Sequence, residues 1–400
     1  TMNFKDDIER AYKEMKLVPI NGQEYAVDRI LTEYFINHKR NVCISADTGS
    51  GKSIIAAVVA LIFKYRYGDK NEAEEMCNAT IAVHSNSLVK QYGDTFKGFP
   101  SEKFHQIIGA SNYKCEAAKH ELKNNLNDKK KVFTGEDCYK AKADESTIAR
   151  FCNNCEYNRA KSLINRTDTL ITNYSYHLIS SMWSRHLRPR RIVIFDEAHT
   201  INDVFCEHNM IYVSAERLNG YIEECKNYFP AECREHMHML GRIRDMILKE
   251  EISEAYYVEV INHLLHAYKK IGNIFINGSK DSELDDYLKM KKIGKKYCDL
   301  GCKIGDLLTY KYDHVFEAKD DEFSIKPIFV GNMANTIMGE YNLFMSATIS
   351  DSFMKMTMDL DQEETAFIKL DPVYSPDSKQ IMFCAPGKLN YRSMKDPEMI

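Results

Sequence analysis

The first stretch with residues suited to chemistry is ADTGSGKS, residues 46–53. It fits the pattern Gly-x-x-x-x-Gly-Lys-Ser/Thr, with Ala46 in the place of the first glycine. In such a loop, the backbone N–H groups and the start of the next helix surround phosphates. We expect Lys52 to contact the β- and γ-phosphates of a nucleotide and Ser53 to hold Mg²⁺. The loop residues predicted to bind ATP are Thr48, Gly49, Ser50, Gly51, Lys52 and Ser53.

A second stretch, RRIVIFDEAHTIND, places acids after an apolar run. Residues 192–195 are typical of a buried strand, and Asp196 and Glu197 follow at its carboxyl end, where ligands bind in open α/β sheets. Hydrolysis of a phosphoanhydride requires one acid on Mg²⁺ and another that activates water. We predict that Asp196 is the metal ligand and that Glu197 is the general base. The predicted catalytic residues are Lys52, Asp196, Glu197 and His199.

Four cysteines between these two stretches suggest a metal site. They are Cys115, Cys138, Cys152 and Cys155, in a polar, lysine-rich segment that cannot bury four thiols in a core of its own. Zinc ribbons usually use two close Cys-x-x-Cys pairs, and only Cys152 and Cys155 form one here. An iron–sulfur cluster takes four thiolates and tolerates uneven spacing. The residues alone leave three alternatives open: unliganded thiols, a zinc site or an iron–sulfur cluster.

Further stretches complete a set of motifs. LFMSATIS contains Ser346 and Thr348, and PINGQEYAVDRI contains Gln23. The cysteines are flanked by IIGASNYKC and by CEYNRAKSLINRTDTLITNYSYHLI. Together the motifs resemble those of the XPD/DinG family of iron–sulfur-cluster superfamily 2 DNA helicases, over roughly residues 17–204 and 340–385. One departure is Ala110, near a position where that family usually has an arginine.

The resemblance implies a [4Fe–4S] cluster bound by the four cysteines, together with ATP and Mg²⁺. It implies that Gln23 reads the adenine, whose edge suits an amide, and that Ser346 and Thr348 couple the nucleotide state to nucleic acid. The implied activity is ATP-dependent unwinding and translocation on single-stranded DNA, 5′ to 3′, in DNA repair or replication, with single-stranded and forked duplex DNA as partners. Two alternatives stay open: a clamp that binds ATP and nucleic acid without unwinding, and an RNA helicase with a zinc-binding insertion.

Contacts with nucleic acid are expected from loops at the carboxyl edge of the sheet. VHSNSLVKQY, residues 83–92, matches the family's motif Ia, and its hydroxyl, ammonium and amide groups suit phosphates. Tyrosines near the cysteines suit stacking on bases, although packing inside the protein is the alternative for each. The predicted DNA-binding residues are Ser85, Lys90, Gln91, Tyr113, Thr172, Asn173 and Tyr174.

These residues require an α/β fold that brings strand ends together. We predict a RecA-like P-loop NTPase domain with a mostly parallel sheet, an iron–sulfur-cluster insertion and a mostly helical insertion. The helical insertion follows from apolar residues at helical spacing, and the resemblance implies that it is arch-like. The predicted order is motor domain over 1–105, cluster insertion over 106–165, motor domain over 166–204, arch-like insertion over 205–330, motor domain over 331–375 and the start of a second motor domain over 376–400.

Length and composition agree with this organisation. The 400 residues are 44% hydrophobic and 28% charged, which favours more than one globular domain. The net charge of −4 gives no overall basic field, so nucleic-acid binding must come from local patches. The polar N-terminus is unlike a signal peptide, and no apolar run is long enough to span a bilayer. We expect a monomeric cytoplasmic protein, nuclear in a eukaryote, with reduced cysteines and no membrane association.

The two ends of the chain suggest a fragment. Thr1 precedes Met2, and only a short segment follows the motif at Ser346. A helicase also needs a second RecA-like domain, whose arginine fingers stabilise the transition state of hydrolysis. We therefore expect a truncated or naturally short form of a larger helicase, with weak activity when alone.

Overall fold

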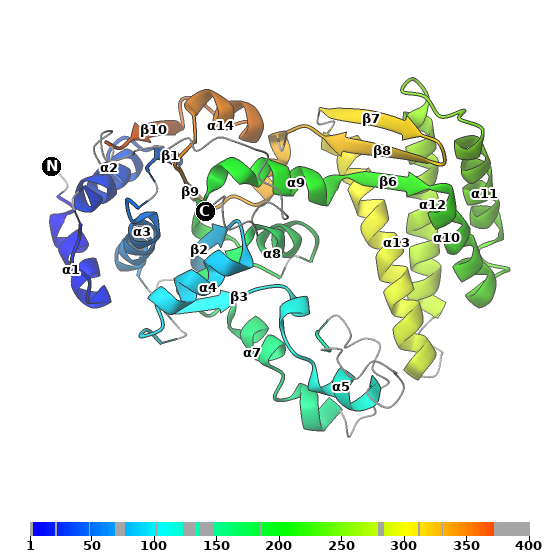
Figure 1. The fold of residues 1–400 in the computed structure, drawn as a ribbon, viewed down its shortest axis with the longest axis horizontal. Coiled ribbons are helices and arrows are strands. Elements are labelled where there is room, and N and C mark those ends of the chain that lie inside the picture. The colour runs from blue at the N-terminus through cyan, green and yellow to red at the C-terminus, as the bar shows by residue number, and fades with distance from the viewer. Residues whose placement is uncertain are drawn as a thin grey trace, which may run out of the picture.

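A seven-stranded sheet with helices on both faces forms the larger part of the molecule, and a mostly helical part lies beside it, to the right in Figure 1. Figure 1 shows a computed structural model of the chain. The structure describes residues 3–20, 22–47, 49–68, 77–100, 103–122, 133–135, 148–184, 186–278, 284–310, 313–329 and 331–371.

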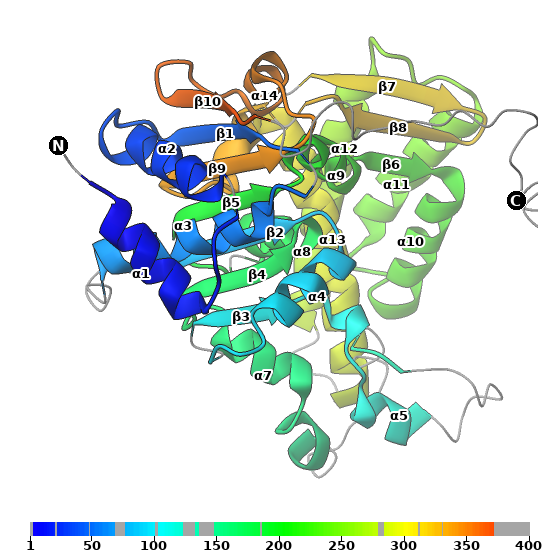
Figure 2. The same ribbon diagram turned by 60° about the vertical axis from the view of Figure 1, so that its left-hand side comes forward.

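The larger sheet is parallel, with the strand order β10–β1–β9–β5–β2–β4–β3. Figure 2 shows these strands stacked from β10 and β1 at the top to β3 at the bottom. Parallel strands that are covered on both faces form continuous buried runs, as in β5 and β9. The predicted RecA-like fold with a mostly parallel sheet is therefore confirmed. The strands are β1 (Asn41–Ser45), β2 (Cys77–Val83), β3 (Phe104–Ile107), β4 (Thr169–Asn173), β5 (Arg190–Asp196), β9 (Tyr341–Ser346) and β10 (Thr365–Lys369).

Alternate residues of the strands face two different layers of helices. Ile192 and Ile194 of β5 lie in the core with α1 to α4, whereas Val193 and Phe195 lie in the core with α8 and α9. This alternation follows from the two-residue period of a strand, and it ties both helical layers to one sheet. The helices around the sheet are α1 (Lys5–Met15), α2 (Gln23–Phe35), α3 (Lys52–Tyr67), α4 (Asn86–Thr95), α8 (Tyr174–Leu178), α9 (Ile201–Asn209) and α14 (Asp351–Met358).

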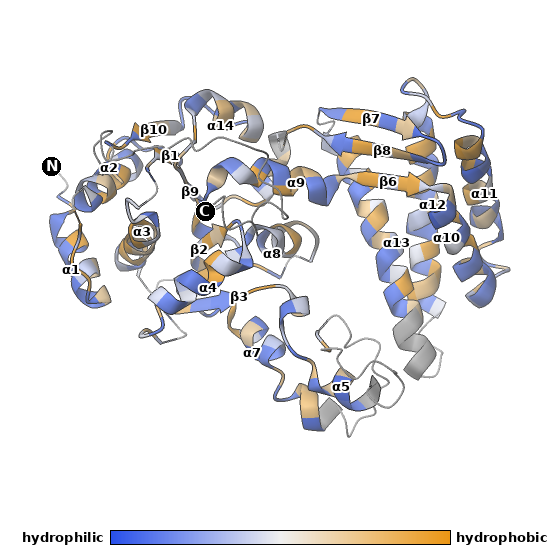
Figure 3. Cartoon of the chain, in the orientation of Figure 1, coloured by the Kyte–Doolittle hydropathy of each residue, from blue (hydrophilic) through white to orange (hydrophobic). Residues whose placement is uncertain are grey.

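The part beside the sheet consists of four helices and a three-stranded antiparallel sheet of order β6–β8–β7. The helices were predicted, but the three strands were not, because β6 pairs with a segment far along the chain and a short strand has little periodic signal of its own. In Figure 3 hydrophobic and hydrophilic residues alternate along β7 and β8, and the outer helices α10 and α11 carry many hydrophilic residues. The elements are α10 (Ala215–Tyr228), α11 (Arg234–Leu248), α12 (Tyr257–Gly278), α13 (Leu284–Tyr310), β6 (Ile211–Ser214), β7 (His314–Lys319) and β8 (Glu322–Pro327).

A smaller unit, which contains Cys115, Cys152 and Cys155, lies below the sheet in Figure 1. It has its own small core, in which Ala118 and Phe133 pack near Cys115. Its elements are η2 (Ala110–Asn112), α5 (Glu116–Leu122), η4 (Ile148–Cys152) and α7 (Glu156–Leu163). Across the described part of the chain, each helix is too short or too polar to span a membrane.

Shortening Phe344 to alanine is expected to lower the free energy of unfolding by about 3–5 kcal/mol. The Phe344 ring is fully buried in β9 and stacks on Phe195 of β5, with ring centroids 5.0 Å apart. The loss combines the transfer free energy of the ring with a cavity between two central strands. Urea unfolding measures it. Met356→Ala on α14, where the side chain is 58% exposed, is the matched control and should change stability by less than about 0.5 kcal/mol. Equal losses in the two variants would contradict the expectation.

Candidate functional site

Three predicted motifs meet at the carboxyl edge of the sheet because their strands are neighbours. β9 lies between β1 and β5, and Ser45 of β1 stands opposite Ser346 of β9. Asp196, at the end of β5, stands opposite Met345 of β9. The phosphate-binding loop, the paired acids and the Ser-Ala-Thr motif therefore form one site, although they are far apart in the sequence.

The loop after β1 has the backbone that a phosphate-binding loop requires. Gly49 and Gly51 have φ values of 88° and 77°, in the left-handed region that favours glycine. A Cβ atom on Gly51 would also lie 2.0 Å from the Nε2 atom of Gln23, so a side chain there would displace the Gln23 amide. α3 begins directly after Gly51, and its first backbone N–H groups are available for phosphate oxygens. Thr48 lies outside the described residues.

Lys52 extends from the start of α3 toward the acids. Its Nζ atom donates a hydrogen bond to the carbonyl oxygen of Ala46 at 3.3 Å and lies 3.6 Å from Oε1 of Glu197. The Lys52 side chain is 9% exposed and that of Glu197 is 32% exposed, so solvent reaches this ion pair from the carboxylate side. The structure thus brings together the predicted phosphate-binding cation and the predicted general base.

Asp196 is buried and held at both carboxylate oxygens. Oδ2 accepts a hydrogen bond from the Tyr92 hydroxyl at 2.9 Å, and Oδ1 accepts one from the backbone N–H of Glu197 at 3.1 Å. Burial raises the pKa of Asp196, while the hydrogen bond from Tyr92 and the charge of Lys52 oppose this rise. A buried carboxylate with a fixed orientation suits a divalent cation, since hard cations prefer oxygen ligands.

Glu197, His199 and Ser346 form a chain from the acids to the Ser-Ala-Thr motif. The Nδ1 atom of His199 lies 3.4 Å from Oε2 of Glu197 and 2.7 Å from Oγ of Ser346. Oγ of Ser346 accepts a hydrogen bond from the backbone N–H of Thr348 at 3.1 Å. Glu197 has φ of 59°, an uncommon value for a residue other than glycine, and such strain concentrates at functional sites. These contacts physically link the predicted base and the predicted coupling residues.

Gln23 braces the loop in this structure. Its Nε2 atom donates to the carbonyl oxygen of Ser50 at 3.3 Å, and its Oε1 atom accepts from the backbone N–H of Ile20 at 3.1 Å and from the Tyr12 hydroxyl at 3.3 Å. The side chain is 4% exposed. Recognition of adenine by Gln23 stays a prediction, and the observed contacts give the same residue a structural role beside the nucleotide loop.

Several of the predicted DNA-binding residues lie at the same edge. Ser85 caps α4, where its hydroxyl accepts a hydrogen bond from the backbone N–H of Leu88 at 3.4 Å. Lys90 and Gln91 are exposed on α4. The side chain of Asn173 reaches Asn86, at the start of α4. Tyr113 is half-buried and packs against Tyr157, with ring centroids 5.3 Å apart.

Thr172 and Tyr174 differ from the expectation that they contact DNA. Both are buried, with 0% and 1% of their surface exposed. The Thr172 hydroxyl donates to the carbonyl oxygen of Ile107 at 2.8 Å, and the Tyr174 hydroxyl donates to the carbonyl oxygen of Asp196 at 2.7 Å. Thr172 lies inside because β4 is flanked by β2 and β3, and Tyr174 lies inside because it begins α8 and packs in the core with Phe195. Their hydroxyls therefore hold the sheet edge together from within.

Tyr92 was not among the predicted site residues, although it ends the stretch over 83–92 and touches Asp196. Tyr92 is 1% exposed, and Val89, three positions earlier on α4, is equally buried. This spacing of three residues indicates the inner face of the helix, and it could have predicted from the sequence that Tyr92 is buried. The sequence could not indicate which polar atom the Tyr92 hydroxyl would meet.

The three described cysteines of the predicted cluster line one cavity of about 380 Å³. Cys115 is buried, and Cys152 and Cys155 are partly exposed. Burial raises the pKa of the Cys152 thiol, and the nearby thiols of Cys115 and Cys155 raise it further. Cys138 lies outside the described residues. Among the residues that are described, no three His, Cys, Asp or Glu side chains are grouped as ligands of one metal ion, so the metal site stays a prediction.

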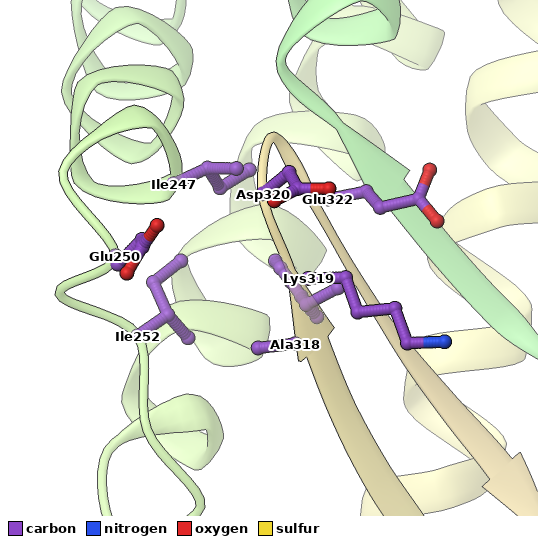
Figure 4. A pocket seen from close by; sticks show the side chains of 8 residues that line it. Ile247, Glu250, Ile252, Ala318, Lys319, Asp320 and Glu322 are labelled. Atoms are coloured by element: carbon purple, nitrogen blue, oxygen red, sulfur yellow. The ribbon is translucent and has the colours of Figure 1, made fainter.

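Another pocket, of about 410 Å³, lies at the turn between β7 and β8 (Figure 4). Ile247 and Ile252 form its apolar side, and Lys319 and Glu322 lie near its rim. The residues that line it include none of the predicted site residues. The nucleotide site is therefore separate from this pocket.

The family of the chain follows from a comparison with known proteins. Residues 16–234 match the family described as "Type III restriction enzyme, res subunit". The chain belongs to this family. The matched residues of this chain include the phosphate-binding loop and the acids. The match agrees with the prediction of a helicase-type, nucleotide-binding domain.

Solved structures similar to this res-subunit family chain include XPD helicases. The structure named XPD_Helicase has 15% sequence identity and a TM-score of 0.47, and the match covers 87% of this chain and 61% of that chain. The structure named Truncated XPD has 16% identity and a TM-score of 0.49, and the match covers 86% of this chain and 98% of that chain.

A curated protein matches over a shorter region. It is "Structural maintenance of chromosomes protein 4" of Xenopus laevis, which is 29% identical over 101 residues, or 22% of this chain. The chain spans 8% of the length of that relative.

Proposed function

We propose that the protein is the first motor domain of an ATP-dependent helicase of the XPD type, acting on single-stranded DNA. The observation that carries the proposal is the distance of 3.6 Å between Nζ of Lys52 and Oε1 of Glu197. Two residues from distant motifs meet at a sheet edge that also presents a phosphate-binding loop and a buried acid. This combination suits hydrolysis of a nucleoside triphosphate bound with a divalent cation.

The residues present fit Mg²⁺, because Ser53 and Asp196 offer oxygen atoms and the Tyr92 hydroxyl fixes the Asp196 carboxylate by a hydrogen bond. When bound, the cation would neutralise charge on the β- and γ-phosphates. Lys52 would leave Glu197 and bind the same phosphates. Glu197 would then accept the proton of a water molecule whose oxygen attacks the γ-phosphorus, while the bond to the ADP oxygen breaks. Without a nucleotide, the Lys52 ammonium group would stay paired with the Glu197 carboxylate, and binding of a nucleotide would separate them.

His199 and Ser346 would couple the state of the nucleotide site to the bound nucleic acid. His199 contacts both the Glu197 carboxylate and the Ser346 hydroxyl, so a change at the γ-phosphate alters a shared hydrogen-bond network. Ser85, Lys90, Gln91 and Asn173 at the same edge would contact the phosphates of a single strand. Travel from 5′ to 3′ and action on forked DNA in repair or replication are carried over from the resemblance to XPD and DinG helicases.

Iron and sulfide are the proposed content of the cysteine cavity. Cys115, Cys152 and Cys155 line one cavity of about 380 Å³, and burial, together with the other two thiols, raises the pKa of the Cys152 thiol, which a positive metal centre would reverse. Cys115, Cys138, Cys152 and Cys155 would supply the four thiolates that a [4Fe–4S] cluster takes. The cluster would cross-link a polar segment whose described core is small.

Nucleotide and nucleic-acid binding test the proposal directly. A fluorescent ATP analogue should bind in the presence of Mg²⁺, and Lys52→Ala should weaken this binding. Single-stranded DNA should bind more tightly than RNA of the same sequence, and it should accelerate ATP turnover. Tighter binding of RNA would favour an RNA helicase instead. Binding of both ligands without stimulated turnover would favour a clamp. Absence of ATP binding would contradict the proposal.

A further inference from the structure

The hydroxyl group of Tyr92 occupies a position that packing does not explain. Tyr92 lies on α4 with 1% of its surface exposed, and its ring packs against Phe96 at a centroid distance of 6.1 Å. Phenylalanine would serve this packing equally well. A hydroxyl that is withdrawn from water must find partners inside the protein, since an unpaired one is costly.

The neighbours of that hydroxyl are the two residues assigned to the cation. The Tyr92 hydroxyl donates to Oδ2 of Asp196 at 2.9 Å, and the Ser53 side chain lies near enough to oppose the rise in the pKa of Tyr92. Ser53 belongs to the start of α3 and Asp196 to the end of β5. One phenol on a third element, α4, therefore bonds to Asp196 and lies beside Ser53.

The other contacts of Asp196 leave room for a cation. Tyr174 holds the backbone carbonyl oxygen at 2.7 Å, and the backbone N–H of Glu197 holds Oδ1. Each carboxylate oxygen has two acceptor sites, and each receives one of these hydrogen bonds at the side chain. Among the described residues, these hydrogen bonds therefore take one acceptor site on each oxygen.

We propose that Tyr92 is a positioning residue of the Mg²⁺ site. Its hydroxyl fixes the orientation of the Asp196 carboxylate beside Ser53 before a nucleotide arrives. The inference rests on the proposed function, because it takes Ser53 and Asp196 as the cation ligands. Tyr92 acts through Asp196 and touches neither the phosphates nor the cation. Such outer partners of metal ligands commonly determine metal affinity.

Tyr34 provides a matched control at the opposite, amino edge of the same sheet. It is also 1% exposed, and its hydroxyl donates to the carbonyl oxygen of Asn342 at 2.6 Å. Asn342 is near the start of β9, at the end of the strand opposite to Ser346. Tyr34→Phe therefore removes one buried hydrogen bond without touching the nucleotide site, as Tyr92→Phe removes its own.

The test is Mn²⁺ binding followed by electron paramagnetic resonance, in the presence of a non-hydrolysable ATP analogue. Tyr92→Phe should weaken binding of Mn²⁺ by about tenfold. It should leave binding of the analogue without metal unchanged, which also shows that the variant is folded. Tyr34→Phe should bind Mn²⁺ as the unaltered protein does.

The possible results distinguish failure of the Tyr92 inference from failure of the proposed function. Equal Mn²⁺ affinities in Tyr92→Phe and the unaltered protein would overturn the inference and leave the proposed function standing. An equal loss in Tyr34→Phe would overturn it too, because the effect would then be a general one. Failure of the unaltered protein to bind the analogue with Mn²⁺ would overturn the proposed function and, with it, the inference.

Discussion

Replacing Glu197 with glutamine is expected to slow ATP hydrolysis by about 10²–10⁴-fold. An amide of the same size cannot accept the proton of the attacking water. ATP binding should persist, because the phosphate-binding loop, Lys52 and Asp196 are unchanged. Loss of the ion pair at 3.6 Å should even release Lys52 toward the phosphates. Phosphate release under single-turnover conditions measures the chemical step, and a fluorescent ATP analogue measures binding.

Glu364→Gln is the matched control for this experiment. Glu364 is 46% exposed near the start of β10, where its carboxylate lies 3.5 Å from Arg40. The substitution removes the same charge from the same sheet, away from the carboxyl edge. It should leave hydrolysis unchanged. If Glu197→Gln hydrolysed ATP at the rate of this control, Glu197 would not be the base.

The second large effect concerns the cysteine cavity. Purified without oxygen, the protein is expected to contain about four irons and four acid-labile sulfides per chain and to absorb broadly in the visible range. Cys155→Ser should abolish most of this content, because a serine oxygen is a harder and weaker ligand for such a cluster than a thiolate. Iron and sulfide analysis with a visible spectrum measures the result.

Cys302→Ser serves as the control for the cluster. Cys302 is an exposed cysteine on α13, outside the unit that holds the cavity. Its replacement should leave the iron content unchanged. A colourless protein with one zinc per chain would contradict the iron–sulfur assignment while keeping the ATP site. Absence of any metal would show that the thiols are unliganded.

The local parts of the site could be predicted from the sequence because they depend on consecutive residues. The loop over 46–53 joins a strand to a helix within one short segment, and only glycine suits the left-handed backbone at Gly49 and Gly51. Asp196 is the last residue of β5 and Glu197 follows it, directly after an apolar run that predicts the strand. In each case the same few residues supply the functional groups and determine the local backbone conformation. The sequence pattern therefore predicts both without knowledge of tertiary contacts.

The tertiary structure alone decided which distant residues meet. The strand order places β9 between β1 and β5, and this brings His199 to Ser346. The same packing buries Thr172 and Tyr174, which the sequence had suggested for DNA contact. These outcomes depend on pairing between segments far apart in the chain, and a period of two or 3.6 residues gives only the face of an element. The sequence by itself determined the nucleotide loop and the acids, whereas the fold decided that Tyr92 would hold Asp196 in place.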